Sequence, residues 1–269
     1  SKIAFVGLPC TIKAFRNAID YQPRKFLKKD LFFIGLTCGG MKSRGFSEFL
    51  FMKNSGDKKN IKSINYRTKK PNRKADNYGY EFKCENHNGE INTVEIQFKE
   101  DIDKYWNGGY FQLNSCFFCD DIFSELADIS VMDAWLPEYV DDWKGNNLII
   151  TRTSLGEKII KDLISNKHLY CDIIDYKEVI RSQQGVIKKK RQRMQFRTQI
   201  MQKENKWVPL KRPAEDIKLS SAEKYYYLNL FHVAKLTREL WAINKNTSLI
   251  EKSVGLIYRS HNIKIKCYK

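Results

Sequence analysis

The first fifty residues alternate short apolar runs with stretches of helical periodicity. Residues 3–7 and 31–36 are continuous apolar runs that lead into glycine-containing turns, a pattern typical of buried β-strands. Apolar residues recur three or four positions apart in residues 12–19, and a second helical stretch begins at Ser43. The order strand, helix, strand, helix indicates a parallel pair of strands joined by a right-handed crossover.

The middle of the chain has the alternating pattern of β-structure. Residues 61–67 and 92–98 are examples, and the turn-rich segment between them is basic over residues 69–74. Further strands are expected at residues 127–133 and 148–152, with a helix after the second. This part of the chain therefore adds a β-rich segment to the strand–helix–strand unit.

The C-terminal part is cationic and helical in pattern. Residues 188–197 are strongly basic, with almost no acidic residue until Glu204. Residues 220–258 have apolar residues at helical spacing along one side: Leu228, Leu230, Val233, Leu236, Leu240 and Ile243. The expected fold class is α/β with some α+β character, ending in a helical C-terminal appendage.

The charge balance of the chain restricts its partners. Among 269 residues, 48 lysines and arginines face 31 acidic residues, a formal net charge of +17. Such an excess attracts phosphate groups, acidic proteins or an anionic membrane surface, and the net charge alone does not distinguish among these partners. No apolar run approaches the ~20 residues that span a bilayer, and no signal-peptide pattern opens the sequence. We expect no transmembrane segment and a cytoplasmic location, with the basic C-terminal region as the means of any peripheral membrane attachment.

Four of the seven cysteines form a candidate metal site. Cys116 and Cys119 have the C-x-x-C spacing that zinc, iron–sulfur and redox sites share, and the acidic residues that follow disfavour a reactive thiolate. Cys10 and Cys38 each follow a predicted strand, and parallel neighbouring strands would bring both to one edge of the sheet. Spacing alone does not distinguish zinc from a [4Fe–4S] cluster, because both accept four thiolates.

Short motifs recur in a fixed order along residues 1–190, and together they resemble a known family. They read Gly-Leu-Pro-Cys at 7–10, Gly-Leu-Thr-Cys-Gly-Gly at 35–40, Tyr-Arg-Thr-Lys at 66–69, Ser-Cys-x-x-Cys-Asp at 115–120, Ala-Asp-Ile-Ser-Val at 127–131 and Thr-Arg-Thr at 151–153. With this set the chain resembles the coenzyme F420 hydrogenase/dehydrogenase beta-subunit family. These proteins are iron–sulfur flavoproteins that pass electrons between a cluster, a flavin and a deazaflavin or other acceptor.

The resemblance implies a ligand set and two cofactors. It implies that Cys10, Cys38, Cys116 and Cys119 ligate one [4Fe–4S] cluster and that an FAD lies close to it. The first candidates for contacts to the FAD pyrophosphate are Arg67, Lys69 and Lys70, and the second are Lys188 and Lys190. Coenzyme F420 or another small hydride carrier is the implied acceptor.

The resemblance also implies an organisation of the chain. Residues 1–190 form an iron–sulfur and flavin-binding α/β domain, and residues 191–269 form a basic, mainly helical region. Family members carry a further segment before the Gly-Leu-Pro-Cys turn, so we expect part of the flavin site upstream of this sequence. A redox partner protein or an upstream ferredoxin-like domain is the expected partner.

Two other function classes remain open from the sequence. The basic charge would suit a nucleic-acid-binding protein with a structural zinc on the four cysteines. Its aromatic residues, however, do not interleave with the basic ones as in an RNA-stacking module. The third class is a non-enzymatic partner subunit that docks through the basic tail onto an acidic protein or an anionic membrane.

Overall fold

The computed structural model describes residues 2–26, 29–55, 60–86, 88–211 and 218–267, with side chains described as far as residue 259. Its internal contacts divide the chain into two compact units. The first unit contains Ser1–Gly39 and Cys119–Arg191, and the second contains Gly40–Phe118 and Gln192–Lys269. We describe each unit by itself.

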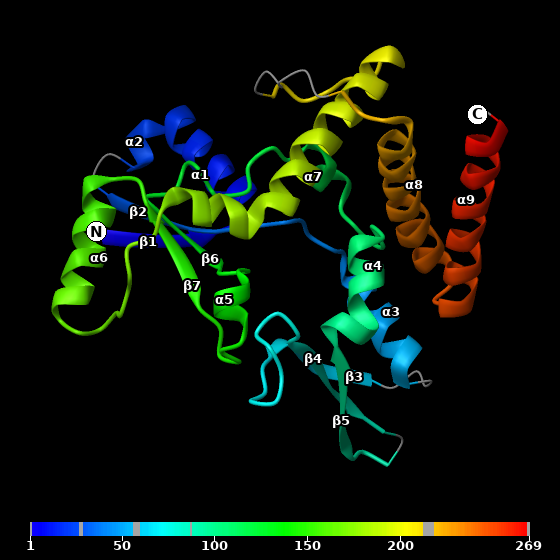
Figure 1. The fold of residues 1–269 in the computed structure, drawn as a ribbon, viewed down its shortest axis with the longest axis horizontal. Coiled ribbons are helices and arrows are strands. Elements are labelled where there is room, and N and C mark those ends of the chain that lie inside the picture. The colour runs from blue at the N-terminus through cyan, green and yellow to red at the C-terminus, as the bar shows by residue number, and fades with distance from the viewer. Residues whose placement is uncertain (1, 27–28, 56–59, 87, 212–217, 268–269) are drawn as a thin grey trace. The chain divides into compact units, whose positions relative to one another are not determined.

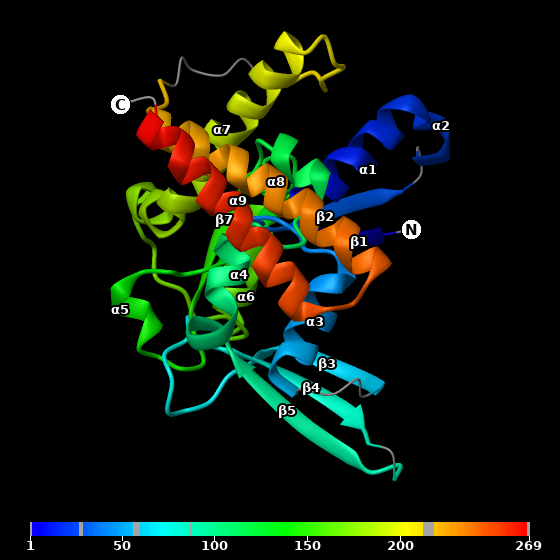
Figure 2. The ribbon, with the colours of Figure 1, turned by 90° about the vertical axis from the view of Figure 1, so that its right-hand side faces the viewer.

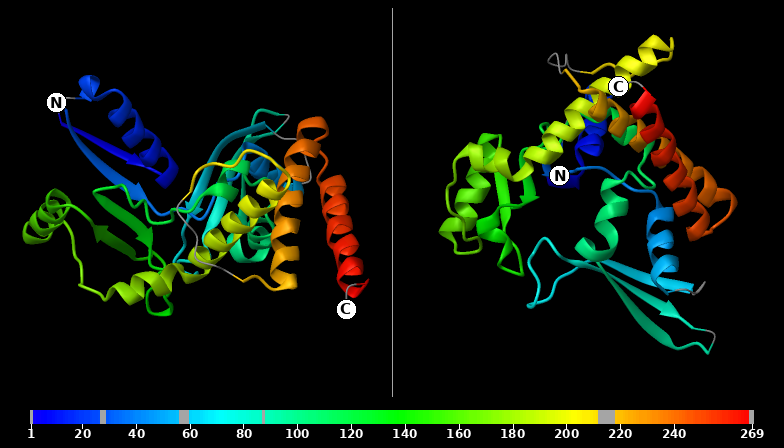
Figure 3. Two further views of the ribbon diagram at one scale, coloured as in Figure 1. Left: turned by 90° about the horizontal axis from the view of Figure 1, so that it is seen from above. Right: turned by 45° about the vertical axis from the view of Figure 1, so that its right-hand side comes forward.

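The first unit is built on a mixed four-stranded sheet (Figure 3, left). Its strand order is β1-β2-β6-β7, with bounds Lys2–Gly7, Asp30–Leu36, Ile129–Asp133 and Asn147–Thr151. β1 pairs with β2 and β2 with β6 in parallel, whereas β7 runs antiparallel to β6. The parallel pairing of the first two strands confirms the strand–helix–strand unit expected from the sequence.

Helix α1 (Pro9–Tyr21) covers one face of the β1–β2 pair. Pro9 stands at the start of the helix, where a missing N–H costs nothing. The fully buried Ile12 packs with Phe33 of β2, and Phe15 meets Phe5 of β1 edge-on at a ring distance of 4.9 Å. The opposite face of β1 is open in the part of the chain that the structure describes, because Val6 is 56% exposed. The expectation of a buried strand was therefore wrong for this face of β1, which lies at the edge of the sheet with a single partner strand.

Three more helices belong to the first unit: α2 (Pro23–Phe26), α5 (Pro137–Val140) and α6 (Ser154–Ser165) (Figure 1). Helix α6 follows β7 as expected, and Thr153 caps it by accepting a hydrogen bond from the Gly156 N–H. The long helix α7 (Tyr176–Lys203) begins in this unit and continues into the second, with the division between Arg191 and Gln192.

The second unit combines an antiparallel sheet with helices from distant parts of the chain (Figures 1 and 2). The sheet has the order β3-β4-β5, with bounds Asn60–Thr68, Gly79–Glu85 and Ile91–Gln97. The helical elements are α3 (Arg44–Ser55), a π-helical turn (Phe98–Ile102), α4 (Asp103–Asn107), a 3-10 turn (Asn114–Phe118), α8 (Ser221–Ile243) and α9 (Thr247–Cys267). Two sheets and a helical C-terminal region confirm the mixed α/β fold class.

Strand β4 was not among the strands named from the sequence, although its pattern is regular. Tyr80, Phe82 and Cys84 alternate with polar residues, and all three are buried in the core of the second unit. Cys84 is fully buried, so it is a core residue in this fold. Period-two alternation was the available signal for this strand.

The helical pattern of residues 220–258 resolves into two helices that run side by side, α8 and α9 (Figures 1 and 2). Ser220 begins α8 through a capping box with Glu223. The break falls after Ile243, the last residue of α8, which is 83% exposed, unlike the buried Leu230 and Val233 of the same apolar side. In the described part of the chain, no helix combines the length and apolar character needed to cross a membrane.

Candidate functional site

Cys10 and Cys38 lie just beyond two neighbouring parallel strands. β1 ends at Gly7 and β2 at Leu36, so each cysteine comes two or three residues after its strand. Cys10 is exposed in the first turn of α1, and Cys38 is half-buried with its N–H donating to the Ile122 carbonyl at 3.1 Å. Carboxyl ends of parallel strands are where open α/β sheets bind ligands.

The ammonium group of Lys190 links the Cys38 loop to the Cys119 loop. Lys190 is only 2% exposed, and its Nζ donates to the Cys38 carbonyl at 2.7 Å and to the Asp121 carbonyl at 3.0 Å. The same Nζ lies 3.3 Å from Cys119 Sγ, which also lies 3.2 Å from the Asp121 carbonyl. A buried cation thus touches the sulfur of one candidate ligand and the backbone of another.

Cys116 belongs to the second unit and lies in the 3-10 turn. Its Sγ accepts a hydrogen bond from the Met41 N–H at 3.3 Å, and its carbonyl accepts one from the buried guanidinium of Arg193 at 3.2 Å. Arg193 also lies over the Phe117 ring, and that ring packs edge-on against Phe231 of α8 at 4.9 Å. The cysteine is therefore placed by helices α7 and α8.

The four cysteine side chains have the chemistry that a metal ion or cluster bound by thiolates requires. Within the described residues, none of Cys10, Cys38, Cys116 and Cys119 forms a disulfide. The hydroxyl of Thr37, beside Cys38, is buried and makes no hydrogen bond within the described residues. Over those same residues, no three His, Cys, Asp or Glu side chains lie close enough together to hold a metal ion. The set of four ligands accordingly stays a prediction.

The basic residues expected to contact a flavin pyrophosphate fall in different surroundings. On β3, the Arg67 guanidinium lies 4.3 Å from the centre of the Tyr78 ring. Lys69 is half-buried just after the strand, and Lys70 forms an ion pair with Glu95. Arg67 thus lies on β3, and Lys69 and Lys70 lie in the β3–β4 connection, all in the second unit. On α7, Lys188 is exposed, whereas Lys190 is buried against the cysteine loops.

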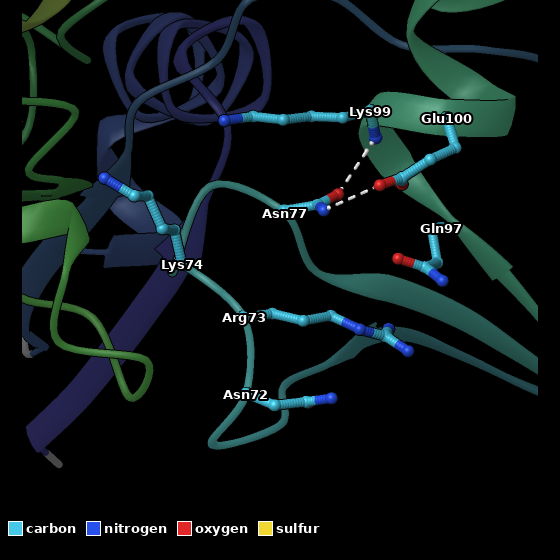
Figure 4. Close-up of a pocket in the computed structure, with 7 residues that line it drawn as sticks. All are labelled: Asn72, Arg73, Lys74, Asn77, Gln97, Lys99 and Glu100. Atoms are coloured by element: carbon cyan, nitrogen blue, oxygen red, sulfur yellow. Dashed lines mark hydrogen bonds between the residues drawn. The ribbon is translucent and has the colours of Figure 1, made fainter.

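A cationic pocket lies beside this connection in the second unit (Figure 4). It has a volume of about 430 Å³, and its charged lining comprises Arg73, Lys74, Lys99 and Glu100. Asn77 holds the pocket wall together, because its Oδ1 accepts from the Lys99 N–H at 3.1 Å and its Nδ2 donates to Glu100 at 3.2 Å. The lining carries three cations and one carboxylate, and two of the cations also form ion pairs with residues outside the lining, Arg73 with Glu95 and Lys99 with Asp76.

Glu95 holds the basic connection to the sheet. Its carboxylate pairs with both Lys70 and Arg73. Burial raises the pKa of Glu95, but hydrogen bonds and charge from these two cations outweigh it and leave the pKa below the usual range. A carboxylate with a lowered folded-state pKa stabilises the fold above its unfolded pKa, and this contribution disappears as the pH falls through the folded pKa.

We therefore expect Glu95→Gln to lower the urea midpoint of unfolding at neutral pH. The difference between wild type and variant should shrink as the pH falls below about 4, where carboxylates protonate. Urea unfolding at a series of pH values measures it. A difference that stays constant down to acid pH would contradict the assigned ion pairs.

The sequence profile of a family described as the C terminus of the coenzyme F420 hydrogenase/dehydrogenase beta subunit matches residues 1–177. The chain belongs to this family. The match confirms the resemblance inferred from the ordered motifs, and it includes all four candidate cysteines and the β3–β4 connection. The helices α8 and α9 lie beyond the matched residues.

One similar solved structure is a chain of the F420-reducing [NiFe] hydrogenase complex from Methanosarcina barkeri, in a xenon derivative. It is 17% identical, with a TM-score of 0.46 over 77% of this chain. The match spans 65% of that chain, so this family member covers slightly less than two thirds of the hydrogenase chain's length. No curated protein matches.

Two residues of this family member that its fold brings to the candidate sites, Arg193 and Lys99, were not predicted from the sequence. Arg193 was seen only as part of a basic run, yet it is buried and contacts the Cys116 carbonyl. Lys99 joins Lys74 at the cationic pocket from a segment about twenty-five residues further along the chain. The basic segment 69–74 was the available signal for the pocket, whereas the contribution of Lys99 depends on tertiary contacts.

Proposed function

We propose that this chain is the electron-transferring part of an iron–sulfur flavoprotein oxidoreductase. In the proposal, Cys10, Cys38, Cys116 and Cys119 hold one [4Fe–4S] cluster, and the chain binds FAD near it. The observation that carries the proposal is the family match over the residues that contain all four cysteines. The buried ammonium at the Cys38 and Cys119 loops supports it, because thiolate-rich groups are anionic.

The protein's contribution in this proposal is position and electrostatics. When bound, the flavin exchanges hydride with a small carrier, and the cluster exchanges single electrons with a partner. The first turn of α1 presents Cys10, the loop after β2 presents Cys38, and the 3-10 turn presents Cys116. Lys190 and the Asp121 carbonyl hold the Cys119 side chain.

The hydride carrier and the electron partner are also inferred from the family. We propose coenzyme F420 or another deazaflavin-like acceptor as the hydride carrier, and a redox partner protein or a ferredoxin-like domain as the electron partner. A cytoplasmic location belongs to the same proposal. The test is anaerobic titration of the chain, loaded with cluster and FAD, with reduced coenzyme F420. Bleaching of the flavin absorbance supports the proposal, and an unchanged spectrum contradicts it.

The cationic pocket of the second unit is a candidate anion site close in the chain to the predicted flavin contacts. We include Arg73, Lys74 and Lys99 with Arg67, Lys69 and Lys70 as the cations that would meet the FAD pyrophosphate. Charge-assisted hydrogen bonds from lysine and arginine are the usual partners of phosphate oxygens. The Glu95 carboxylate fixes the connection that carries several of these cations.

Lys74→Met is the direct test of the pocket. Losing one hydrogen bond to a charged group costs about 1.5–3 kcal/mol, so the Kd for FAD should rise about tenfold or more. Quenching of FAD fluorescence on titration with the full chain measures the Kd. Lys83→Met removes the same charge from an exposed position on β4 and should leave the Kd unchanged. Equal Kd values for both variants would contradict a pyrophosphate contact in this pocket.

The nucleic-acid alternative loses part of its support in this structure. It depended on the basic run 188–197 as a phosphate-binding surface. Two cations of that run, Lys190 and Arg193, are almost completely buried and donate to protein acceptors. Buried cations cannot neutralise the phosphates of a duplex or single strand.

A further inference from the structure

Lys190 is a buried cation whose acceptors, within the described residues, do not include a carboxylate. Its Nζ donates to two backbone carbonyls, those of Cys38 and Asp121, and lies 3.3 Å from Cys119 Sγ. Its neighbours on the same helix are not buried in this way, because Lys188 and Arg191 are exposed. The fold therefore places one positive charge of this basic run inside the protein, at the loops that carry two candidate ligands.

Burying a charge is costly unless an opposite charge or several hydrogen bonds compensate it. Two carbonyls satisfy the ammonium as a donor, but they supply no full negative charge. A cluster held by four thiolates is anionic and becomes more so when it takes up one electron. An ammonium at hydrogen-bonding distance from a ligand sulfur would lower the energy of that extra electron, because hydrogen bonds to sulfur and net charge set the potentials of such clusters.

We propose that Lys190 is a positioning residue that raises the reduction potential of the cluster through Cys119. This inference rests on the proposed cluster. The ammonium directs one N–H to the Cys119 sulfur and fixes the Cys38 loop through its carbonyl. It thereby stabilises the reduced, more negative form and holds two ligand loops in one arrangement.

This role differs from the flavin contact predicted for Lys190 from the sequence. The side chain is 2% exposed, and all three of its observed acceptors belong to the cysteine loops. A pyrophosphate contact would require the ammonium to leave two carbonyls at once. The positions of these three acceptors therefore favour a role of Lys190 at the cluster ligands over a contact with the pyrophosphate.

The experiment compares three variants of the full chain after anaerobic assembly with iron and sulfide. Lys190→Met keeps the length of the side chain and removes its charge and donors. Lys190→Arg keeps the charge and donors. Arg191→Met removes a charge from the adjacent, exposed position of the same helix. The readouts are iron and sulfide per chain and the midpoint potential from an EPR-monitored redox titration.

We expect Lys190→Met to disfavour reduction of the cluster at least tenfold, which is about 59 mV for one electron. Lys190→Arg should restore most of this shift, and Arg191→Met should keep the wild-type potential. A wild-type potential in a fully loaded Lys190→Met protein would overturn the role of Lys190 and leave the proposed function standing. A wild-type chain that assembles no iron and sulfide would overturn the proposed function, and the role of Lys190 with it.

If Lys190→Met does not fold, Lys190→Gln takes its place in the experiment, because the glutamine side chain keeps a neutral hydrogen-bond donor. If Lys190→Gln is folded by circular dichroism and loaded, it should also show the lowered potential. If it is folded but holds no iron, while Lys190→Arg holds a full complement, the positioning role is supported. If both neutral variants unfold and Lys190→Arg does not, Lys190 is a structural tie and the proposed effect on the potential is wrong.

Discussion

Cys116→Ser should lose the iron–sulfur cluster while the chain stays folded. A serine hydroxyl replaces the thiolate with a harder and much weaker ligand for iron, so one corner of a four-cysteine cluster loses its bond. Cys116 lies in a 3-10 turn and is half-buried, so exchanging sulfur for oxygen should cost little in packing. Iron content, sulfide content and the visible absorbance of the assembled protein measure the loss, and circular dichroism reports the fold.

The matched control is Cys171→Ser. Cys171 is a free, exposed cysteine that lies outside the helices and strands. Its variant should assemble the same amount of iron as the wild type. Cys10→Ser, Cys38→Ser and Cys119→Ser should behave like Cys116→Ser. A full complement of iron in any of the four variants would remove that cysteine from the ligand set.

Phe49→Ala should strongly destabilise the second unit. Phe49 of α3 is fully buried. The centre of its ring lies 5.1 Å from that of Tyr105, 5.6 Å from that of Phe111 and 6.0 Å from that of Trp241. Truncation removes the buried ring and leaves a cavity that aromatic neighbours fill poorly. Changes of this kind cost about 3–5 kcal/mol in free energy of unfolding.

Urea unfolding followed by circular dichroism measures this effect. Tyr170→Ala is the control, because Tyr170 is 86% exposed and its truncation leaves no cavity. The control should change the free energy of unfolding by less than about 0.5 kcal/mol. A Phe49→Ala variant as stable as the Tyr170→Ala variant would contradict the central place of Phe49 in this core.

Local pattern predicted much of the fold because each element carries its own periodicity. The parallel β1–β2 pair, the β-rich middle and the helical C-terminal region follow from apolar runs, alternation and helical spacing. The exposed outer face of β1 could not be predicted in this way. An apolar run indicates a buried strand, but it does not show whether that strand lies at the edge of the sheet. The break after Ile243 lacks a glycine or proline to mark it, so the pattern continued across it.

The association of distant segments could not be read from the sequence. The second unit joins residues 40–118 to residues 192–269, and the periodicity of either segment gives no sign of the other. The division of function between residues 1–190 and 191–269 stays a prediction. The division by contacts also passes between residues 191 and 192, but it assigns residues 40–118 to the C-terminal side.

The cysteines and their surroundings were predictable to different degrees. Residue type, C-x-x-C spacing and strand ends selected the four thiols, and the ordered motifs led to the family that the match confirms. The place of Lys190 was not predictable, because Cys38 lies 152 residues and Cys119 lies 71 residues from it in the chain. A run of basic residues gives no indication of which member a fold will bury.

We propose above all that this chain holds a four-cysteine iron–sulfur cluster and works in electron transfer. The most direct test of this proposal is the content of iron, zinc and acid-labile sulfide per chain in protein purified without oxygen. We expect about four irons and about four sulfides per chain. About one zinc per chain with no sulfide would contradict the proposal, because zinc has no redox chemistry and the site would then be structural.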